Sequence, residues 1–275
     1  MFEPSDVTVV LPAVERQGEA DPWIDLHLAL HSLKAYTPAG TRLLVAWKGR
    51  IPPIHDEHTE HSYWRPEWRL VPQDPLCING GAAMDFAIRY ADSRLLLITG
   101  DDCVFMPDFL ERMLEEYNHL SAQGVKVGLL GVRSNYVKGP QNIRYQHDRS
   151  VHLGAGGLNF PWEGQLQETD MAVVPIASML SLRSFYEVGG YPHGNWFTDD
   201  VFSWQLRNLG HRNWISRAYV HHVGMRCTGQ DNSDELRRKG IAWLQEEHPQ
   251  FLVDLARKRA IREAAQAGNG AAAQP

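Results

Sequence analysis

The alternation of strand and helix patterns at the N-terminus limits the possible folds most strongly. Residues Val7–Leu11 form a β-branched apolar run followed by Pro12, which predicts a buried strand that stops at the proline. Trp23–Tyr36 carries leucines at helical spacing ahead of Pro38, and Leu43–Trp47 is a second apolar run. A strand, a helix and a strand in this order predict a βαβ unit, and therefore a parallel sheet with helices on its faces.

The rest of the chain continues this alternation and predicts an α/β fold with a mostly parallel central sheet flanked by helices. The most apolar strand pattern is Arg94–Thr99, which runs into Gly100-Asp101-Asp102. The irregular segment 134–170 is long, and such loops in compact enzymes are usually functional or mobile. Further strands are expected at Arg69–Val71, Val125–Val132, Met171–Leu182 and Asn213–Val220, and helices at Gly81–Ala91, Pro107–Leu120, Asp200–Leu209 and Ser233–Ala265, before a disordered tail at 266–275.

Length and composition fit a single domain over residues 1–265, or at most two closely packed lobes. The chain has 275 residues, of which 43% are hydrophobic and 22% charged, as in ordinary globular enzymes. A net charge of -6 argues against a dedicated nucleic-acid binder, which would show a basic face. The three cysteines form no CxxC pair, so we expect a reduced, cytoplasmic setting. No apolar run reaches the roughly 18 residues of a transmembrane helix, although docking at a membrane surface stays open.

Two adjacent carboxylates follow the most apolar strand. Ligands of open α/β sheets bind outside the carboxyl ends of the strands, which is where Asp101 and Asp102 lie. Neighbouring carboxylates at a buried strand end are costly unless positive charge is present, and a divalent cation with a bound diphosphate would supply it. The alternative is a polar strand end that caps the next helix, as aspartates in turns often do. The spacing alone leaves both interpretations open.

The surrounding sequence resembles family 2 glycosyltransferases. Asn79–Ala91, Leu95–Asp102 and Met106–Leu110 are similar to the family's small-residue helix, its strand ending in a DxD motif and the helix start that follows. Val7–Pro12 resembles the family's opening strand. The resemblance implies a GT-A fold whose nucleotide-sugar-binding half covers about 1–132. It also implies that the donor is bound by Pro12, Asp85, Arg89, Asp101 and Asp102.

Two later blocks complete the resemblance. Leu182–Tyr191 and Phe197–Gly210 are similar to the family's block with an acidic pair that supplies the general base. Ala218–Gly224 is similar to the family's late strand, which ends in a histidine that often completes the metal site. The resemblance thus implies an acceptor-binding and catalytic half at about 133–232, followed by a helical segment at 233–265. It places the catalytic roles on Asp199 and Asp200.

The sequence departs from the family pattern at several positions. Gly100 stands where the DxD motif has its first aspartate, which leaves Asp102 in the position of the direct metal ligand. The family's aspartate near the nucleobase is replaced within Ala46–Gly49, so the resemblance does not identify the nucleotide. In the late block, Phe202 and Gln205 replace an acidic residue and an arginine.

The predicted chemistry is sugar transfer with inversion, assisted by Mn²⁺ or Mg²⁺. The resemblance implies that Asp102 and His221 hold the cation, which would neutralise the diphosphate leaving group. We expect Asp200 to accept the proton of the acceptor hydroxyl. Other interpretations stay open, because Asp199 and Asp200 could cap a helix and His221 could be an ordinary buried histidine. His222 would point to the opposite face of the strand and is the alternative ligand.

Several aromatic side chains are candidates for the acceptor side, because aromatic rings stack on sugar faces. These candidates are Trp162, Trp196 and His222. The glycines at 154–157 lack the strand–turn–helix context of a phosphate loop, which favours a flexible lid. The histidines at 55, 58 and 61 lie in a polar, proline-rich loop, and we interpret them as solvent-exposed rather than as a metal site.

The main prediction is an inverting glycosyltransferase with a nucleotide-diphospho-sugar donor. Its hydroxyl-bearing acceptor could be a glycan, a lipid-linked sugar, a protein or a modified nucleic-acid base, and homo-oligomerisation stays open. The first alternative is a non-catalytic relative of this glycosyltransferase family that binds a nucleotide sugar or a glycan without turnover. The second is a nucleotidyltransferase, which would require a basic, glycine-rich loop after the first strand, and Leu11–Arg16 does not supply one.

Overall fold

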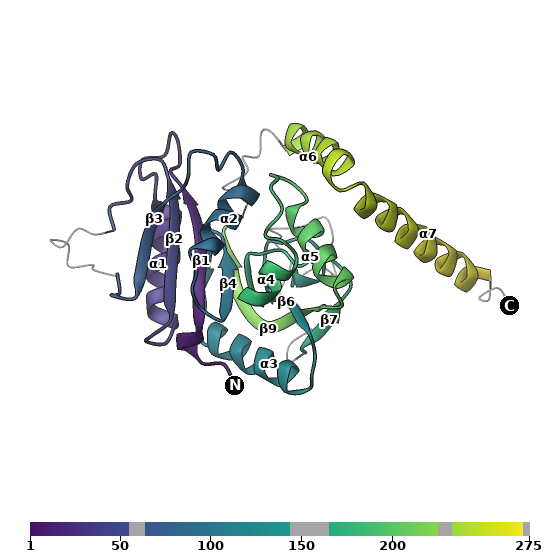
Figure 1. Cartoon of the computed structure of the whole chain (residues 1–275), viewed down its shortest axis with the longest axis horizontal. Helices are drawn as coiled ribbons and strands as arrows, with labels where there is room; N and C mark the ends of the chain where they lie inside the picture. The colour runs from purple at the N-terminus through teal and green to yellow at the C-terminus, as the bar shows by residue number, and fades with distance from the viewer. Residues whose placement is uncertain (55–63, 144–164, 225–232, 272–275) are drawn as a thin grey trace.

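The structure is a computed structural model that describes residues 1–54, 64–143, 165–224 and 233–271. A mixed sheet with the strand order β3-β2-β1-β4-β8-β6-β9-β5 runs through its centre, and helices cover both faces (Figure 1). This architecture confirms the predicted α/β class.

The first half of the sheet consists of four strands that pair in parallel: β1 (Val7–Val14), β2 (Arg42–Lys48), β3 (Trp68–Pro72) and β4 (Leu95–Thr99). The helix α1 (Ile24–Tyr36) connects β1 to β2, and α2 (Gly80–Arg89) connects β3 to β4. The N-terminal βαβ unit is therefore present as predicted.

The second half of the sheet is mixed. β8 (Ala177–Ser181) lies antiparallel between β4 and β6 (Val127–Arg133), and β9 (Arg212–His222) runs parallel to β6. The short strands β5 (Cys103–Phe105) and β7 (Gln167–Thr169) pair with opposite ends of β9. Through β5, the residues that follow β4 come to lie against the C-terminal end of β9.

Apolar side chains on both faces of the sheet are buried. One face packs against α1 and α3 (Phe109–Ala122), and the other against α2, α4 (Leu182–Glu187) and α5 (Thr198–Asn208). Alternate residues of β4 belong to the two clusters, which explains why that strand is apolar throughout. Phe202, one of the departures from the family pattern, is fully buried in the second cluster.

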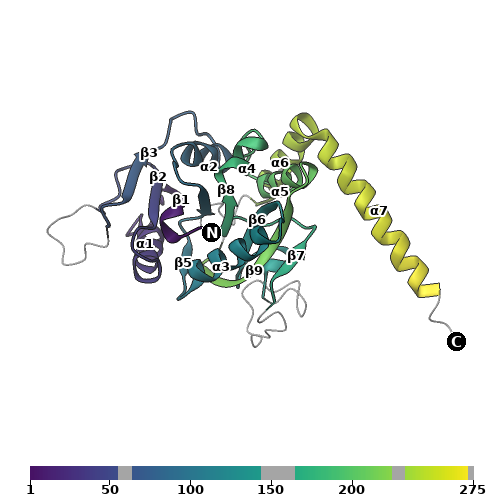
Figure 2. The ribbon, with the colours of Figure 1, turned by 60° about the horizontal axis from the view of Figure 1, so that its bottom comes forward.

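The C-terminal segment forms two helices, α6 (Ser233–Glu247) and α7 (Pro249–Ala271), rather than the one expected. The break lies at His248 because Pro249 cannot donate the hydrogen bond that a continuous helix requires. α7 also extends into the segment for which we expected disorder. Its first turns pack on α5, and its remainder extends away from the sheet (Figures 1 and 2). No helix in the described ranges is long and apolar enough to cross a membrane.

Two predicted strand boundaries were wrong. β1 continues through Pro12 to Val14 and pairs with β2 over this length. Proline is tolerated here because the pairing of β1 with β4 ends at Val10, so β4 needs no hydrogen bond from Pro12. The strand expected at Met171–Leu182 forms only as β8. It stops because the Ser181 hydroxyl accepts a hydrogen bond from the backbone of Ser184 and caps α4.

Candidate active site

The pairing of β5 with β9 brings an acidic and a basic side chain together. Cys103 lies opposite His222 in this ladder, so Asp102, which precedes β5, lies beside the imidazole. Asp102 Oδ2 is 3.2 Å from His222 Nε2, and the two side chains are only 7% and 15% exposed. The backbone N–H of Val223 donates to the Asp102 carbonyl oxygen at 2.9 Å, which fixes the approach of the two segments.

The surroundings of His222 determine which ring nitrogen faces the carboxylate. Nδ1 lies 2.5 Å from the carbonyl oxygen of Tyr136, and because a carbonyl only accepts, Nδ1 carries a proton. Nε2 is thereby directed at Asp102. The amide of Asn135 holds the backbone of His222 in place, accepting from its N–H at 2.9 Å and donating to its carbonyl at 3.1 Å. A histidine oriented in this way is typical of metal sites.

The structure does not bring His221 to Asp102. Successive residues of a strand point to opposite faces, so His221 points away from the face where His222 meets the carboxylate. The side chain of His221 lies on the exposed side, with Nδ1 3.4 Å from the hydroxyl of Tyr219. The partner of Asp102 is therefore His222, in place of the expected His221.

Burial and pairing together set the ionisation of Asp102 and His222. Burial works to raise the pKa of Asp102, but the hydrogen bond and charge of His222, with the charge of Arg16, outweigh it and leave this pKa below its usual value. Burial works to lower the pKa of His222, but the hydrogen bond and charge of Asp102 raise it overall. The arrangement thus favours a carboxylate beside an imidazolium.

Asp101 points toward β1 rather than toward His222. Its Oδ1 accepts from Nη2 of Arg16 at 2.9 Å, and its Oδ2 accepts from the backbone of Val14 at 3.3 Å. Nε of Arg16 also lies 3.3 Å from Oδ2 of Asp25 on α1. Asp101 therefore connects the end of β4 to the end of β1. Sequence reasoning missed Arg16, which is 85 residues away from Asp101 in the chain.

Asp85 and Arg89 connect α2 to the turn before α5. Arg89 Nε donates to Asp85 Oδ2 at 2.7 Å, and the backbone N–H of Tyr191 donates to Oδ1 at 2.8 Å. Gly190 has a φ of +113°, and a Cβ there would meet Asp85 Oδ1 at 2.5 Å, so this turn requires glycine. Both carboxylate oxygens of Asp85 are engaged within the protein. Pro12, the other expected donor contact, lies near the end of β1 beside β2.

The expected base lies in an ion-paired cluster. Asp199 and Asp200 are in the first turn of α5, where the helix dipole favours carboxylates. Nζ of Lys138 is 2.9 Å from Asp199 Oδ2 and 2.5 Å from Asp200 Oδ2. Burial and the charge of Asp199 raise the pKa of Asp200, while Lys138 opposes that rise. Burial works to lower the pKa of Lys138, but the two carboxylates raise it overall.

A cavity of about 480 Å³ lies on one side of this cluster, and we call it the His222 cavity. Its lining includes Tyr136, Lys138, Trp196, Asp199 and His222. The structure thus brings Trp196 and His222, both expected on the acceptor side, into the cavity that contains the imidazole of the Asp102 pair. Trp162, the glycines at 154–157 and the histidines at 55, 58 and 61 lie outside the described residues.

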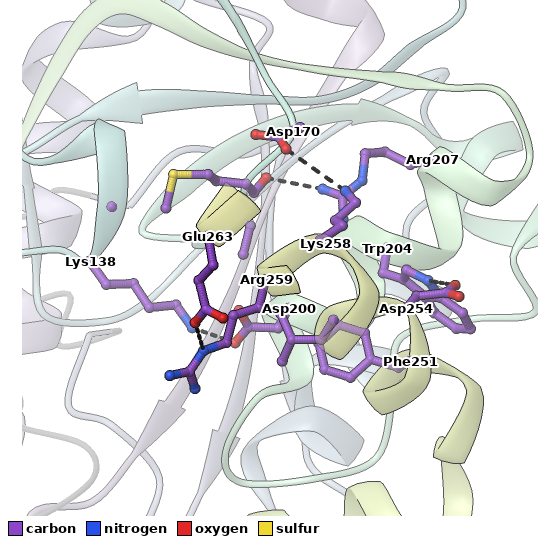
Figure 3. Close-up of a pocket in the computed structure, with 14 residues that line it drawn as sticks. Lys138, Asp170, Asp200, Trp204, Arg207, Phe251, Asp254, Lys258, Arg259 and Glu263 are labelled. Atoms are coloured by element: carbon purple, nitrogen blue, oxygen red, sulfur yellow. Dashed lines mark hydrogen bonds and ion pairs between the residues drawn. The ribbon is translucent and has the colours of Figure 1, made fainter. Parts of the chain in front are cut away.

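A second cavity of about 470 Å³ lies on the other side, between α5 and α7, and we call it the α7 cavity. Lys138 and Asp200 lie at one side of it, and side chains of α7 approach from the other (Figure 3). Nε1 of Trp204 donates to Asp254 Oδ2 at 3.0 Å, which connects α5 to α7. Nη1 of Arg207 donates to the carbonyl oxygen of Met171 at 3.2 Å. Aromatic, cationic and acidic groups therefore surround this space.

The fold is of the GT-A type, which two solved structures of glycosyltransferases share. Residues 76–179 match the family model of "Glycosyl transferase family 2", which confirms the resemblance that the sequence showed. The matched segment includes Asp101, Asp102 and Lys138, and ends before α5 and β9. Over this segment, the chain is similar to family 2 glycosyltransferases.

Two solved structures, both GT-A glycosyltransferases, have a similar fold. S. aureus TarS, residues 1–349, superposes with a TM-score of 0.53 at 11% identity, over 78% of this chain and 60% of that one. GalNAc-T7, solved with UDP, GalNAc and Mn²⁺, superposes with a TM-score of 0.56 at 11% identity, over 81% of this chain and 44% of that one. This chain spans less than two thirds of either structure. A search of curated protein sequences found no match.

Proposed function

We propose that this chain transfers a sugar from a nucleotide-diphospho-sugar to an acceptor hydroxyl, with inversion at the anomeric carbon. One observation carries the proposal: the cavity lined by His222 and the cavity lined by Asp200 meet at Lys138. The diphosphate part of the donor would occupy the His222 cavity, and the acceptor would enter the α7 cavity. The GalNAc-T7 structure, which holds UDP, GalNAc and Mn²⁺ on a similar fold, supports this kind of donor.

The Asp102–His222 pair suits a divalent cation such as Mn²⁺ or Mg²⁺. The proton on Nδ1 is held by the Tyr136 carbonyl, so Nε2 and the carboxylate oxygen are the two donor atoms, and a cation would replace the proton between them. In the described part of the chain, no group of three or more His, Cys, Asp or Glu side chains could hold a metal ion by itself. The remaining ligands would be oxygens of the diphosphate and water. The cation would neutralise charge on the leaving diphosphate.

Asp200 is the proposed general base. The acceptor oxygen forms a bond to the anomeric carbon while its proton passes to the Asp200 carboxylate. The bond from the anomeric carbon to the diphosphate oxygen breaks, and the diphosphate leaves with that electron pair. Attack from the face opposite the leaving group inverts the configuration. The raised pKa of Asp200 makes it a better proton acceptor than an exposed aspartate.

A thermal-shift screen tests the donor site. We expect one of UDP, GDP, dTDP or CDP, or a sugar conjugate of it, to raise the Tm only with Mn²⁺ present, because a ligand that binds the native state stabilises it. Asp102→Ala and His222→Ala should abolish the shift. His221→Ala is the matched control and should retain it, since that side chain lies on the opposite face of β9.

The alternative functions predict other outcomes. If no nucleotide raises the Tm in the presence of metal, the donor site is refuted and a glycan-binding function without turnover is favoured. If a nucleotide binds but no sugar is released with any acceptor, the protein is a nucleotide-sugar binder rather than an enzyme.

A further inference from the structure

We infer that Lys138 couples the binding of the donor to the release of Asp200, the proposed base, from its ion pair. In the free protein its ammonium group holds Asp200 in an ion pair. A diphosphate bound in the His222 cavity attracts the ammonium, and Asp200 then becomes available to accept a proton. The inference rests on the proposed function. Lys138 is thus a positioning residue, which acts on the acceptor through Asp200.

The position of Lys138 between the cavities is the first argument. Asp199 lines the His222 cavity, Asp200 lines the α7 cavity, and Lys138 lines both. Its Nζ contacts one carboxylate oxygen of each aspartate, at 2.9 and 2.5 Å. An anion that enters the His222 cavity therefore meets the same ammonium group that pairs with Asp200 on the other side.

Hydrogen bonds hold the backbone around Lys138 in place, whereas its side chain can move. Gln141 is buried and its Nε2 donates to the carbonyl of Val132 at 3.0 Å, and Nδ2 of Asn142 donates to the carbonyl of Val137 at 2.8 Å. The Lys138 side chain is 48% exposed, and a lysine carries its charge on a flexible four-carbon stem. The ammonium can change partner without a change in the loop.

The charges around Asp200 are the third argument. Asp199 and Arg207 lie near it on α5, Asp170 comes from the segment after β7, and α7 contributes Arg259 and Glu263, which pair with each other at 2.8 Å. Among the residues that the structure describes, Lys138 is the cation in direct contact with the Asp200 carboxylate. A carboxylate held by an ammonium is a weaker base than the same carboxylate released from it. Donor binding would therefore strengthen the base at the moment when it is needed.

Inorganic pyrophosphate with Mg²⁺ serves as the probe, since it carries the charge of the diphosphate without requiring the nucleotide to be known. Its affinity is measured by calorimetry on the full chain. The apparent pKa of Asp200 is measured by NMR on protein with ¹³C-labelled aspartate carboxyls, with and without the probe, and D200N identifies the signal. The variants are Lys138→Met, Lys138→Arg and the matched control Lys126→Met. Lys126 is 49% exposed and forms an ion pair of 3.1 Å with Glu187.

We expect K138M to bind magnesium pyrophosphate about tenfold more weakly than the wild type, because a charge-assisted hydrogen bond is lost. The pKa of Asp200 should rise on binding in the wild type. In K138M it should already be higher without the probe and should rise less on saturation. K138R should restore much of the coupling, and K126M should behave as the wild type.

Equal affinity and an equal rise of the Asp200 pKa in K138M and the wild type would overturn the inference, because the rise would then come from the charge of the probe alone. Loss of the coupling in K126M as well would overturn it by showing a general loss of stability. A wild type that binds no pyrophosphate would instead refute the donor site of the proposed function.

Discussion

At the scale of single residues, Asp200 has to meet two opposed requirements if it is the general base, as proposed. It must be ionised in order to accept a proton, and it must be basic enough to keep that proton during bond formation. Burial and the neighbouring Asp199 raise its pKa, whereas Lys138 and the first turn of α5 stabilise the charged form. Burial, the charge of Asp199 and the contacts of Lys138 together set how basic the carboxylate is.

Asp200→Asn tests the assignment of the base. We expect kcat to fall by a factor of about 10² to 10⁴, the usual contribution of a general base. The donor-dependent rise in Tm should persist, because Asp200 lines the α7 cavity and the donor pair lies at the other one. Product release and thermal shift are measured on the same samples. Asp92→Asn, at an exposed ion pair with Arg42, is the control. Normal turnover by D200N would refute the role.

The sequence indicated which residues belong to the candidate site better than it indicated the contacts between them. Asp102 and Asp200 stand out because each adjoins a recognisable strand or helix, but the choice between His221 and His222 depends on how β9 aligns with β5. Lys138 lies 62 residues from Asp200 in an irregular segment. No local pattern marks such a residue, because its role arises only from tertiary contacts.

At the scale of elements, a charged cluster joins the end of α4 to β6 and β9. Glu187 Oε2 lies 3.1 Å from Nζ of Lys126 and 3.0 Å from Nε2 of the buried His211. Nδ1 of His211 lies 3.2 Å from the carbonyl oxygen of Val127, the first residue of β6. Hydrogen bonds from Lys126, His211 and Arg183 lower the pKa of Glu187 to about 2.

The lowered pKa of Glu187 determines how the stability of the folded protein changes with pH. The folded protein holds Glu187 ionised down to a pKa of about 2, below the ordinary value of 4.5. Its contribution to stability is therefore present above pH 4.5 and is lost as the pH falls toward 2. We expect Glu187→Gln to lower the free energy of unfolding at neutral pH and to flatten its decline in acid, as measured by urea unfolding between about pH 5 and 3.

Glu263→Gln is the control for this measurement, because its pair with Arg259 is exposed on α7 and exposed ion pairs contribute little to stability. An unchanged acid slope in E187Q would show that other carboxylates dominate.

The sequence predicted the long elements well and the short ones poorly. α1 and α2 begin and end within two residues of their expected bounds because periodic apolar positions and a following proline or charged segment mark them. β5 and β7 have three residues each, too few for a period, and exist through their pairing with β9. The break between α6 and α7 was missed although Pro249 marks it.

At the scale of the whole molecule, α7 joins the body through its first turns. Phe251 is 7% exposed, packs with Val201 of α5 and Leu244 of α6, and lies 5.8 Å from the ring of Trp204. The later turns of α7 extend outward in both views (Figures 1 and 2). The aromatic contact, with the hydrogen bond from Trp204 to Asp254, thus holds α7 against α5.

Phe251→Ala should loosen α7, since removing a buried phenylalanine costs about 3–5 kcal/mol of packing. We expect faster proteolysis after α6 and a higher KM for the acceptor, with an unchanged donor-dependent shift in Tm. Val253→Ala on the same helix, 58% exposed, is the matched control. An unchanged acceptor KM together with accelerated proteolysis would show that α7 does not form part of the acceptor site.

The proposed donor site and the proposed acceptor site are formed by separate parts of the chain. The Asp102–His222 pair lies where β5 meets β9, whereas much of the lining of the α7 cavity comes from α7, which packs on α5 and α6. We therefore expect substitutions on this helix to leave the strands that hold Asp102 and His222 in place. Under the proposed function, changes in this one helix would alter which acceptor binds, while descendants of this protein inherit the donor pair unchanged.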